Sequence, residues 1–178
     1  MAINITVEDG TGVVGANSYI SVADAITYAA NRGIVLPTTP DTVEAWLIRS
    51  SDYLNGLRGQ YKGLQTYPGT TMQWPRTGVY IDGNTDYLAV DAVPADIAAA
   101  QVQLVIALNA GIELDSPIVG GVLPIIREKV DVLETEYATP AMMGAMAGSA
   151  WGSDSMPAVD ALLAPYLRTV TGFRVYRV

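Results

Sequence analysis

The side chains able to do acid–base or nucleophilic chemistry are few in kind in this chain of 178 residues. Histidine and cysteine are absent, which removes thiolate nucleophiles, disulfides, zinc sites built from these residues and the usual general base near neutral pH. Catalysis would have to use carboxylates, tyrosines or one of the lysines, Lys62 and Lys129. We therefore expect a protein that is not an enzyme and that holds no cofactor and no metal.

The segment Gly10–Gly15 has glycines at its first, third and sixth positions, the spacing of a dinucleotide-binding fingerprint. That function needs a buried strand that runs into the glycines and a helix that begins within them, facing a pyrophosphate. Here Glu8 and Asp9 interrupt such a strand, and the next helix signal comes only at Ser21. An ordinary glycine loop is the better interpretation.

Asp82, Asn84 and Asp86 supply the first three ligand positions of a calcium loop. However, Tyr87 and Val93 stand where that loop needs a glycine and a bidentate glutamate. The sequence therefore favours a turn over a calcium site.

Glu134 and Glu136 would share one face of a strand, as a pair of catalytic carboxylates could. Such a pair needs a cleft and a raised pKa on one partner, and nothing in the sequence supplies either. A solvated strand face is the better interpretation.

Trp74-Pro75-Arg76 is the most informative short motif. A residue before proline favours an extended backbone, and a nearby arginine can lie over an aromatic face or pair with a carboxylate. One interpretation is a loop anchored on the core by its tryptophan. The other makes Trp74 and Arg76 part of a contact with a partner chain.

The last eleven residues contain arginines and aromatic residues but no acid. This composition is preferred at protein interfaces, where arginine and aromatic residues are enriched and lysine is depleted. We predict that this arm binds a partner, or alternatively that it packs as an edge strand against residues 129–138. The partner-binding candidates in the arm are Arg168, Phe173, Arg174, Tyr176, Arg177 and Val178.

The whole chain is acidic, with a net charge of −8. Nucleic-acid binders draw much of their affinity from cations placed on phosphates, so this balance argues against tight DNA binding. No apolar run approaches the roughly 20 residues that span a bilayer, and the first residues lack the pattern of a signal peptide. We expect a soluble chain that does not contact membranes.

The elements that would position these residues are mainly helices. Helix signals begin at Ser21, at Thr39-Pro40, at Pro94 and at Pro157. The helix after Pro94 has no charge from Ile97 to Ile112, which predicts burial on all sides, either inside a bundle or at a subunit interface.

Between these helices the sequence predicts extended structure. Residues 60–90 alternate glycine, proline, threonine and tyrosine, which indicates a β-hairpin or a long ordered loop. Residues 129–137 alternate like a half-exposed strand, and residues 139–155 have the composition of a flexible loop.

We therefore expect a mainly α fold, a small bundle of about four helices with extended N- and C-terminal arms. Its parts would be an arm and loop over 1–20, a helical domain over 21–167 with an insertion at 60–90, and a C-terminal arm over 168–178.

The chain also resembles a phage protein family often labelled "putative DnaT-like single-stranded-DNA-binding protein". The resemblance runs in order over nearly the whole chain, and its opening and its Trp-Pro-Arg segment are the more specific parts. The stretches that carry it are Val7–Gly12, Ala16–Tyr19, Trp74–Val79, the Pro94 helix, Lys129–Ala138 and Pro157–Leu163.

This resemblance implies a structural virion protein, a head-to-tail adaptor in the phage neck that is assembled in the host cytoplasm. Its partners would be the portal protein, a tail or tail-completion protein and further copies of itself in a ring, with genomic DNA passing through the lumen without being held. A lumen of this kind should be neutral or electronegative, and Asp82, Asp86, Asp91, Glu113 and Asp115 are candidates to line it. The alternative is a single-stranded-DNA-binding accessory protein of replication, favoured by the basic tail and the ten tyrosines.

Overall fold

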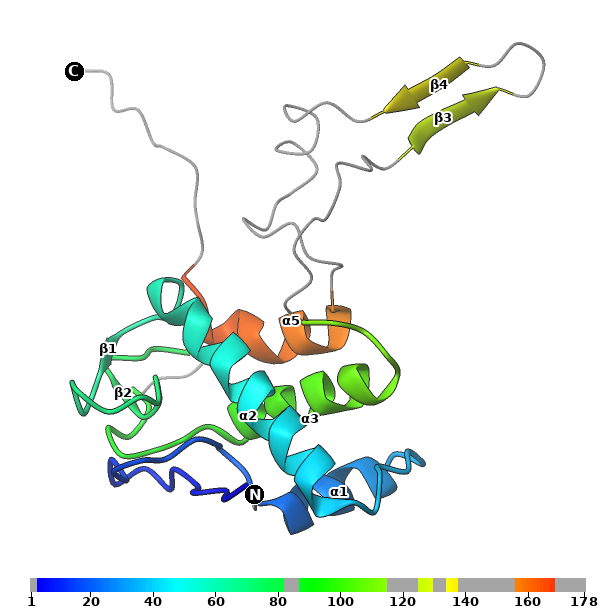
Figure 1. The fold of residues 1–178 in the computed structure, drawn as a ribbon. Helices are drawn as coiled ribbons and strands as arrows, with labels where there is room; N and C mark the ends of the chain where they lie inside the picture. Colours follow the sequence, from blue (N-terminus) through cyan, green and yellow to red (C-terminus); the bar gives the residue numbers. More distant parts are fainter. Residues whose placement is uncertain (1–2, 82–86, 115–124, 130–133, 138–155, 169–178) are drawn as a thin grey trace, which may run out of the picture. The chain divides into compact units, whose positions relative to one another are not determined.

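The computed structural model describes residues 3–81, 87–114, 125–129, 134–137 and 156–168, with the backbone alone for 125–129 and 134–137. The chain divides into two compact units, residues 1–114 together with 156–178, and residues 115–155. Four α-helices make up most of the regular structure in the described part of the chain (Figure 1). The predicted mainly α fold is confirmed.

The first helix, α1 (Val22–Ala30), begins with a cap that the sequence predicts. The Ser21 hydroxyl oxygen accepts a hydrogen bond from the Asp24 backbone N–H at 3.1 Å and donates one to the Asp24 carboxylate at 2.6 Å. Asp24 thus replaces the glutamate of a capping box by bonding to the serine side chain. The chain leaves the helix through Gly33, whose φ of 73° suits a residue without a Cβ.

Helix α2 (Pro40–Gly56) has proline in its first turn, as predicted, although the Thr39 side chain makes no capping hydrogen bond. Its last turn continues into the 3-10 helix η1 (Leu57–Gly59). Helix α5 (Pro157–Leu163) passes into the 3-10 helix η2 (Ala164–Tyr166), which contains Pro165 and forms a tighter last turn.

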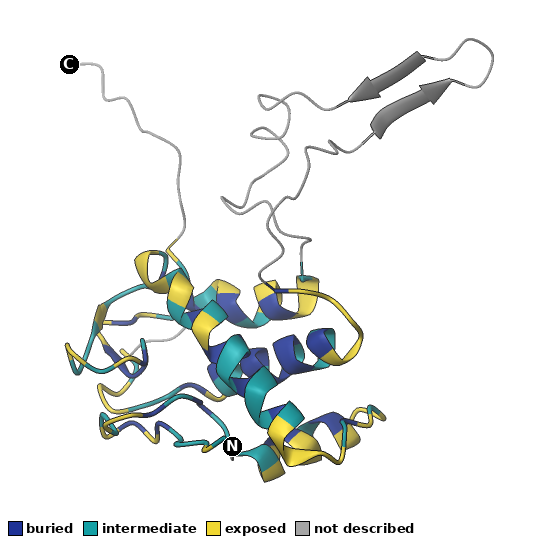
Figure 2. Ribbon diagram, viewed as in Figure 1, coloured by how far each residue is buried: buried dark blue, intermediate teal, exposed yellow. Residues whose placement is uncertain are grey.

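Helix α3 (Ala95–Asn109) is the central helix of the body and packs against α1, α2 and α5. Figure 2 shows α3 as largely buried, while the outer side of α2 is exposed. Gln101 of α3 is buried, and its side-chain amide is fully hydrogen-bonded. The amide oxygen accepts from the Tyr19 backbone N–H at 2.8 Å, and the amide nitrogen donates to the Ser18 hydroxyl and the Leu47 carbonyl. Seven of the fifteen residues of α3 are buried in the body, and this packing accounts for the missing charge on that side of the helix.

The glycine loop near the N-terminus is folded back on the body. The buried Glu8 carboxylate accepts hydrogen bonds from the backbone N–H groups of Gly10, Gly12 and Val13, each at 2.9 Å. These amides are the groups that a dinucleotide loop would present to a phosphate. The chain's own carboxylate binds them instead, in agreement with an ordinary glycine loop.

The predicted hairpin or long loop at 60–90 contains two very short strands, β1 (Leu64–Gln65) and β2 (Arg76–Thr77), which pair antiparallel. The turn between them carries Met72 and Trp74 into the main hydrophobic core. Gly63 has a φ of 68°, and a Cβ there would collide with the Thr77 carbonyl. The absence of a side chain lets the two strands approach.

In the second unit, the strand predicted over 129–137 is replaced by a hairpin. Strand β3 (Ile125–Lys129) pairs antiparallel with β4 (Glu134–Tyr137). The expectation of a single strand was wrong because a two-residue alternation looks the same on both sides of a turn. The predicted loop at 139–155 lies outside the described residues.

Candidate nucleic-acid interface

Two extended segments that are distant in sequence lie side by side at the end of the helical body. Tyr61 and Leu167 form an antiparallel bridge. The Lys62 backbone N–H donates to the Tyr166 carbonyl at 2.8 Å, and the Arg168 backbone N–H donates to the Gln60 carbonyl at 2.7 Å. This pairing places Lys62 and Arg168 in the same small surface area.

A pair of tyrosines adjoins these cations. The Lys62 ammonium donates to the Tyr80 carbonyl at 3.3 Å. The Tyr80 ring meets the Tyr87 ring edge to face, with centroids 5.9 Å apart, and Tyr80 and Tyr87 are 42% and 70% exposed. An exposed aromatic ring beside a cation is the combination that single-stranded nucleic acids recognise.

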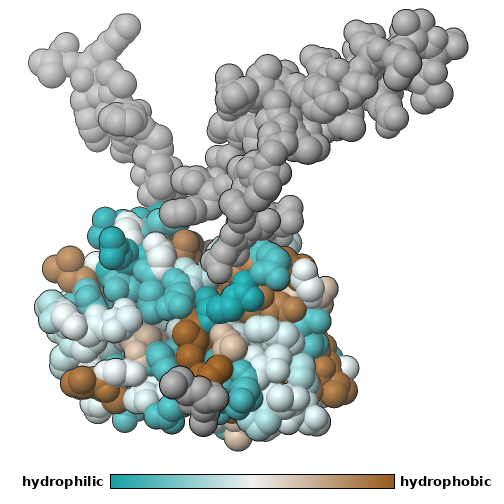
Figure 3. Space-filling model, viewed as in Figure 1, coloured by the Kyte–Doolittle hydropathy of each residue, from teal (hydrophilic) through white to brown (hydrophobic). Residues whose placement is uncertain are grey.

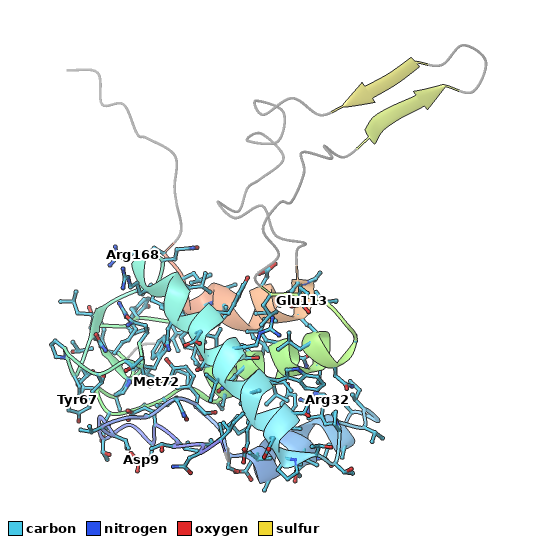
Figure 4. All side chains as sticks on the ribbon, in the orientation of Figure 1. Asp9, Arg32, Tyr67, Met72, Glu113 and Arg168 are labelled. Carbon is cyan, nitrogen blue, oxygen red and sulfur yellow. The ribbon has the colours of Figure 1, made fainter. Side chains whose placement is uncertain are left out.

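The basic side chains of the helical body are unevenly distributed. Exposed Arg58 lies in η1, directly before the segment that pairs with Arg168, and Figure 4 shows Arg168 beside this end of α2. By contrast, Arg49 is bonded to Glu113 at 2.7 Å, and Arg32 lies at the far end of α1 over the Tyr28 ring. We define the candidate interface by its five side chains: Arg58, Lys62, Tyr80, Tyr87 and Arg168.

Trp74 and Arg76, both predicted as partner-binding residues, lie inside the body. Trp74 is fully buried, and its ring meets those of Tyr61 and Tyr166 edge to face at 5.6 and 5.4 Å. Arg76 is only 4% exposed and donates to backbone carbonyls. The structure therefore agrees with a loop anchored on the core, and neither side chain presents a surface to a partner.

Buried tyrosine hydroxyls surround this anchor. The Tyr19 hydroxyl accepts from the backbone N–H groups of Gln73 and Trp74 and donates to the Asn55 amide oxygen. Burial raises the pKa of Tyr19 and of Tyr61 above the ordinary value of 10.0. These hydroxyls stay neutral at physiological pH and act as hydrogen-bonding groups of the core.

Several of the sequence predictions fall outside the described residues. Of the predicted partner-binding arm only Arg168 is described, and it is exposed. Asp91 and Glu113 are also exposed, and no group of three carboxylates able to hold a metal occurs in the described ranges. The other residues of these predictions, all undescribed, are Phe173, Arg174, Tyr176, Arg177, Val178, Asp82, Asn84, Asp86 and Asp115.

The sequence did not predict four members of this interface, namely Arg58, Lys62, Tyr80 and Tyr87. The signal that could have pointed to the last three is weak: a lone lysine and two tyrosines within a segment rich in glycine and proline. Only the pairing of residues 60–62 with 166–168 gathers the cations of one segment beside those of the other.

The structure is that of a small, mainly helical protein, and its described part contains no helix that could cross a membrane. The sequence model of a family described as "Putative DnaT-like ssDNA binding protein" matches residues 3–178. The chain belongs to this family. No curated protein and no solved structure matches it significantly.

Family membership corrects the main functional interpretation of the sequence. The head-to-tail adaptor is wrong, because the family description names single-stranded-DNA binding, the alternative considered above. The same finding contradicts the portal and tail partners and the DNA that passes without being held. The net charge of −8 does not exclude single-stranded-DNA binding, because it sums over the chain, whereas a phosphate senses the cations near it.

Proposed function

We propose that this protein is a non-catalytic binder of single-stranded DNA. The observation that carries the proposal is the family match over residues 3–178. The helical body supplies a surface of matching chemistry, the candidate interface defined above.

Single strands are bound by cations that follow the phosphates and by aromatic rings on which bases stack. Lys62 and Arg168 are held beside one another by backbone hydrogen bonds, so their placement costs little additional ordering. Tyr87 presents most of its ring to solvent, with Tyr80 supporting it from the side. An unpaired base could stack on Tyr87, so this surface should favour single strands over a duplex.

Binding should be modest and sensitive to salt. Each phosphate neutralised on a single strand changes the slope of log K against log salt by about −0.7. If each of its three cations, Arg58, Lys62 and Arg168, neutralises one phosphate, this surface predicts a slope of about −2. The remaining acidic surface repels DNA at long range, so the affinity should be much lower than that of a strongly basic binder.

The test is a fluorescence anisotropy titration of the full chain with a labelled single strand, and with the matching duplex, at 20–150 mM salt (about the range in which screening changes most). We expect the single strand to bind more tightly than the duplex, with affinity falling as salt rises. Absence of binding at the lowest salt, or equal affinity for the duplex, contradicts the proposal.

A matched pair of arginine variants locates the binding surface. Arg168→Gln and Arg32→Gln remove the same charge from two exposed positions, one inside the candidate interface and one at the far end of α1. Only Arg168→Gln should weaken binding. Equal losses in both variants would show that net charge, and not this surface, determines the affinity.

A further inference from the structure

Arg76 is a buried cation that donates hydrogen bonds to three backbone carbonyl groups. Its Nε donates to the Lys62 carbonyl at 2.9 Å, one terminal nitrogen donates to the Gly63 carbonyl at 2.9 Å, and the other donates to the Gln73 carbonyl at 3.3 Å. Within the described part of the chain, none of its hydrogen bonds reaches a carboxylate.

Burying a guanidinium in this position costs folding free energy, because the carbonyl dipoles around it only partly replace the hydration that the charged group loses. Burial lowers the pKa of Arg76, and the nearby positive charge of Arg168 lowers it further, whereas Tyr61 raises it. A methionine could fill much of the same space without this cost. The position therefore calls for a reason beyond packing.

The three carbonyl groups that Arg76 holds belong to the segments that build the interface. Lys62 and Gly63 lie on one side, and Gln73 belongs to the turn that carries Trp74 into the core. Arg76 itself lies in β2, the strand from which the chain continues to Tyr80. The planar guanidinium group of Arg76, with its fork of N–H donors, thus fixes the backbone of Lys62 relative to the tyrosine pair.

The charge of Arg76 also lies just beneath the surface cations. Its guanidinium carbon is 5.5 Å from the centre of the Tyr61 ring, and Tyr61 is the residue that pairs with Leu167. A charge in a region of low dielectric is screened less than an exposed one. Its field therefore reaches an anion bound at Lys62 and Arg168.

We propose that Arg76 is the positioning residue of the candidate interface, holding Lys62 beside Tyr80 and adding a positive charge beneath the bound phosphate. This inference depends on the proposed function. It assigns to Arg76 an effect on DNA without contact, unlike the direct partner contact that one of the two sequence interpretations gave it.

Two substitutions distinguish the effect of the planar guanidinium geometry of Arg76 from the effect of its positive charge. Arg76→Lys keeps the charge but not the planar fork, and Arg76→Gln removes the charge and keeps a donor. Arg32→Gln is the matched control, because it makes the same change in net charge at an exposed site. Each variant is titrated with the labelled single strand at several salt concentrations, at a temperature where circular dichroism shows the native helical signal.

We expect Arg76→Gln to weaken binding by about tenfold and to reduce the salt slope, while Arg76→Lys keeps the slope and loses affinity by a few-fold. Combined with Lys62→Ala, which already removes the positioned group, Arg76→Lys should add almost nothing. A folded Arg76→Gln that binds with unchanged affinity and slope overturns the inference. The inference is also overturned if the affinity losses of Arg76→Lys and Lys62→Ala add fully in the double variant.

The unchanged protein provides a measurement that does not depend on variant folding. The Arg76 Nε–H is buried and hydrogen-bonded to the Lys62 carbonyl, so its proton should exchange slowly and be visible by NMR. Addition of the oligonucleotide should shift this resonance, while the Arg32 side chain stays unaffected. If the strand binds and Arg76 does not shift, the inference fails and the proposed function stands. If the strand does not bind at all, the proposed function itself has failed.

Discussion

Lys62 and Arg168 are separated by more than a hundred residues, yet their backbones run antiparallel next to each other. The N–H of Lys62 donates to the Tyr166 carbonyl, and the N–H of Arg168 donates to the Gln60 carbonyl. This pairing joins the end of α5 and η2 to the segment that follows α2, and it produces a local basic surface on an acidic protein. Figure 3 shows that hydrophobic and hydrophilic residues are mixed on the visible face of the body.

Replacing Arg168 should reduce DNA binding without reducing stability. Arg168→Ala removes an exposed side chain but keeps the backbone hydrogen bond to Gln60. We expect affinity for a single strand to fall about three- to tenfold at low salt, with a salt slope smaller by about 0.7. Anisotropy titrations at several salt concentrations measure both quantities. A changed melting temperature would instead show that the side chain supports the fold.

The exposed ring of Tyr87 should contribute stacking. Tyr87→Ala should cost about 1–3 kcal/mol of binding free energy, the usual value for the loss of a stacked base. Tyr87→Phe keeps the ring and should bind almost normally, whereas Tyr87→Leu keeps apolar bulk and should resemble Tyr87→Ala. A leucine variant that binds like the unchanged protein would exclude stacking as the source of affinity.

The Glu8 carboxylate should be essential to the N-terminal loop. One of its oxygens accepts from Gly10 and Gly12, and the other accepts from Val13. Glu8→Ala leaves three loop amides without this acceptor and should cost about 2–4 kcal/mol of unfolding free energy. Glu8→Gln should lower the unfolding free energy by less, because the amide oxygen of glutamine can still accept hydrogen bonds from the backbone N–H groups that one of the two carboxylate oxygens serves.

Urea unfolding followed by circular dichroism measures this loss. The exposed neighbour Asp9 is the control, and Asp9→Asn should leave the unfolding curve almost unchanged. A Glu8→Ala protein as stable as the Asp9→Asn protein would contradict the structural role of this carboxylate.

Alkaline pH should destabilise the fold through its buried tyrosines. The pKa of Tyr61 in the folded chain is raised by burial above its ordinary value of 10.0, so the contribution of the neutral hydroxyl is complete below pH 10 and is lost as pH rises further. In that range, each buried tyrosine with a raised pKa should lower the free energy of unfolding by about 1.4 kcal/mol per pH unit. Tyr61→Phe removes this titration together with the hydrogen bond to the Leu54 carbonyl.

We therefore expect Tyr61→Phe to be less stable than the unchanged protein at pH 8 but to lose stability less steeply between pH 10 and 11. Urea unfolding at these pH values measures the two slopes. Identical slopes would mean that the Tyr61 hydroxyl does not titrate on unfolding.

The sequence of residues 169–178 suggests an additional cationic contribution to binding. This segment begins directly after Arg168 and contains Arg174 and Arg177. Its deletion should reduce the salt slope by up to about 1.4, if both arginines neutralise phosphates, and should leave the melting temperature nearly unchanged. Salt-dependent titration and thermal unfolding of the truncated chain test the two expectations separately.

The sequence by itself determined the helices of this protein and the class of its fold. Ser21, Pro40 and Pro157 begin three of the helices, and the uncharged stretch after Pro94 forms the central one. These predictions succeed because capping and helical periodicity act between residues only a few positions apart.

The tertiary structure alone decided which polar residues face solvent and which meet. Arg76, a long charged side chain, lies under the surface because the adjacent carbonyl oxygens of Lys62 and Gly63 converge on it with that of Gln73. The backbones of Lys62 and Arg168 come into one area because the Tyr61–Leu167 bridge closes a loop of about a hundred residues, and neither the spacing of these residues nor the net charge signals this pairing. Such contacts depend on the packing of the whole chain, so local patterns do not reveal them.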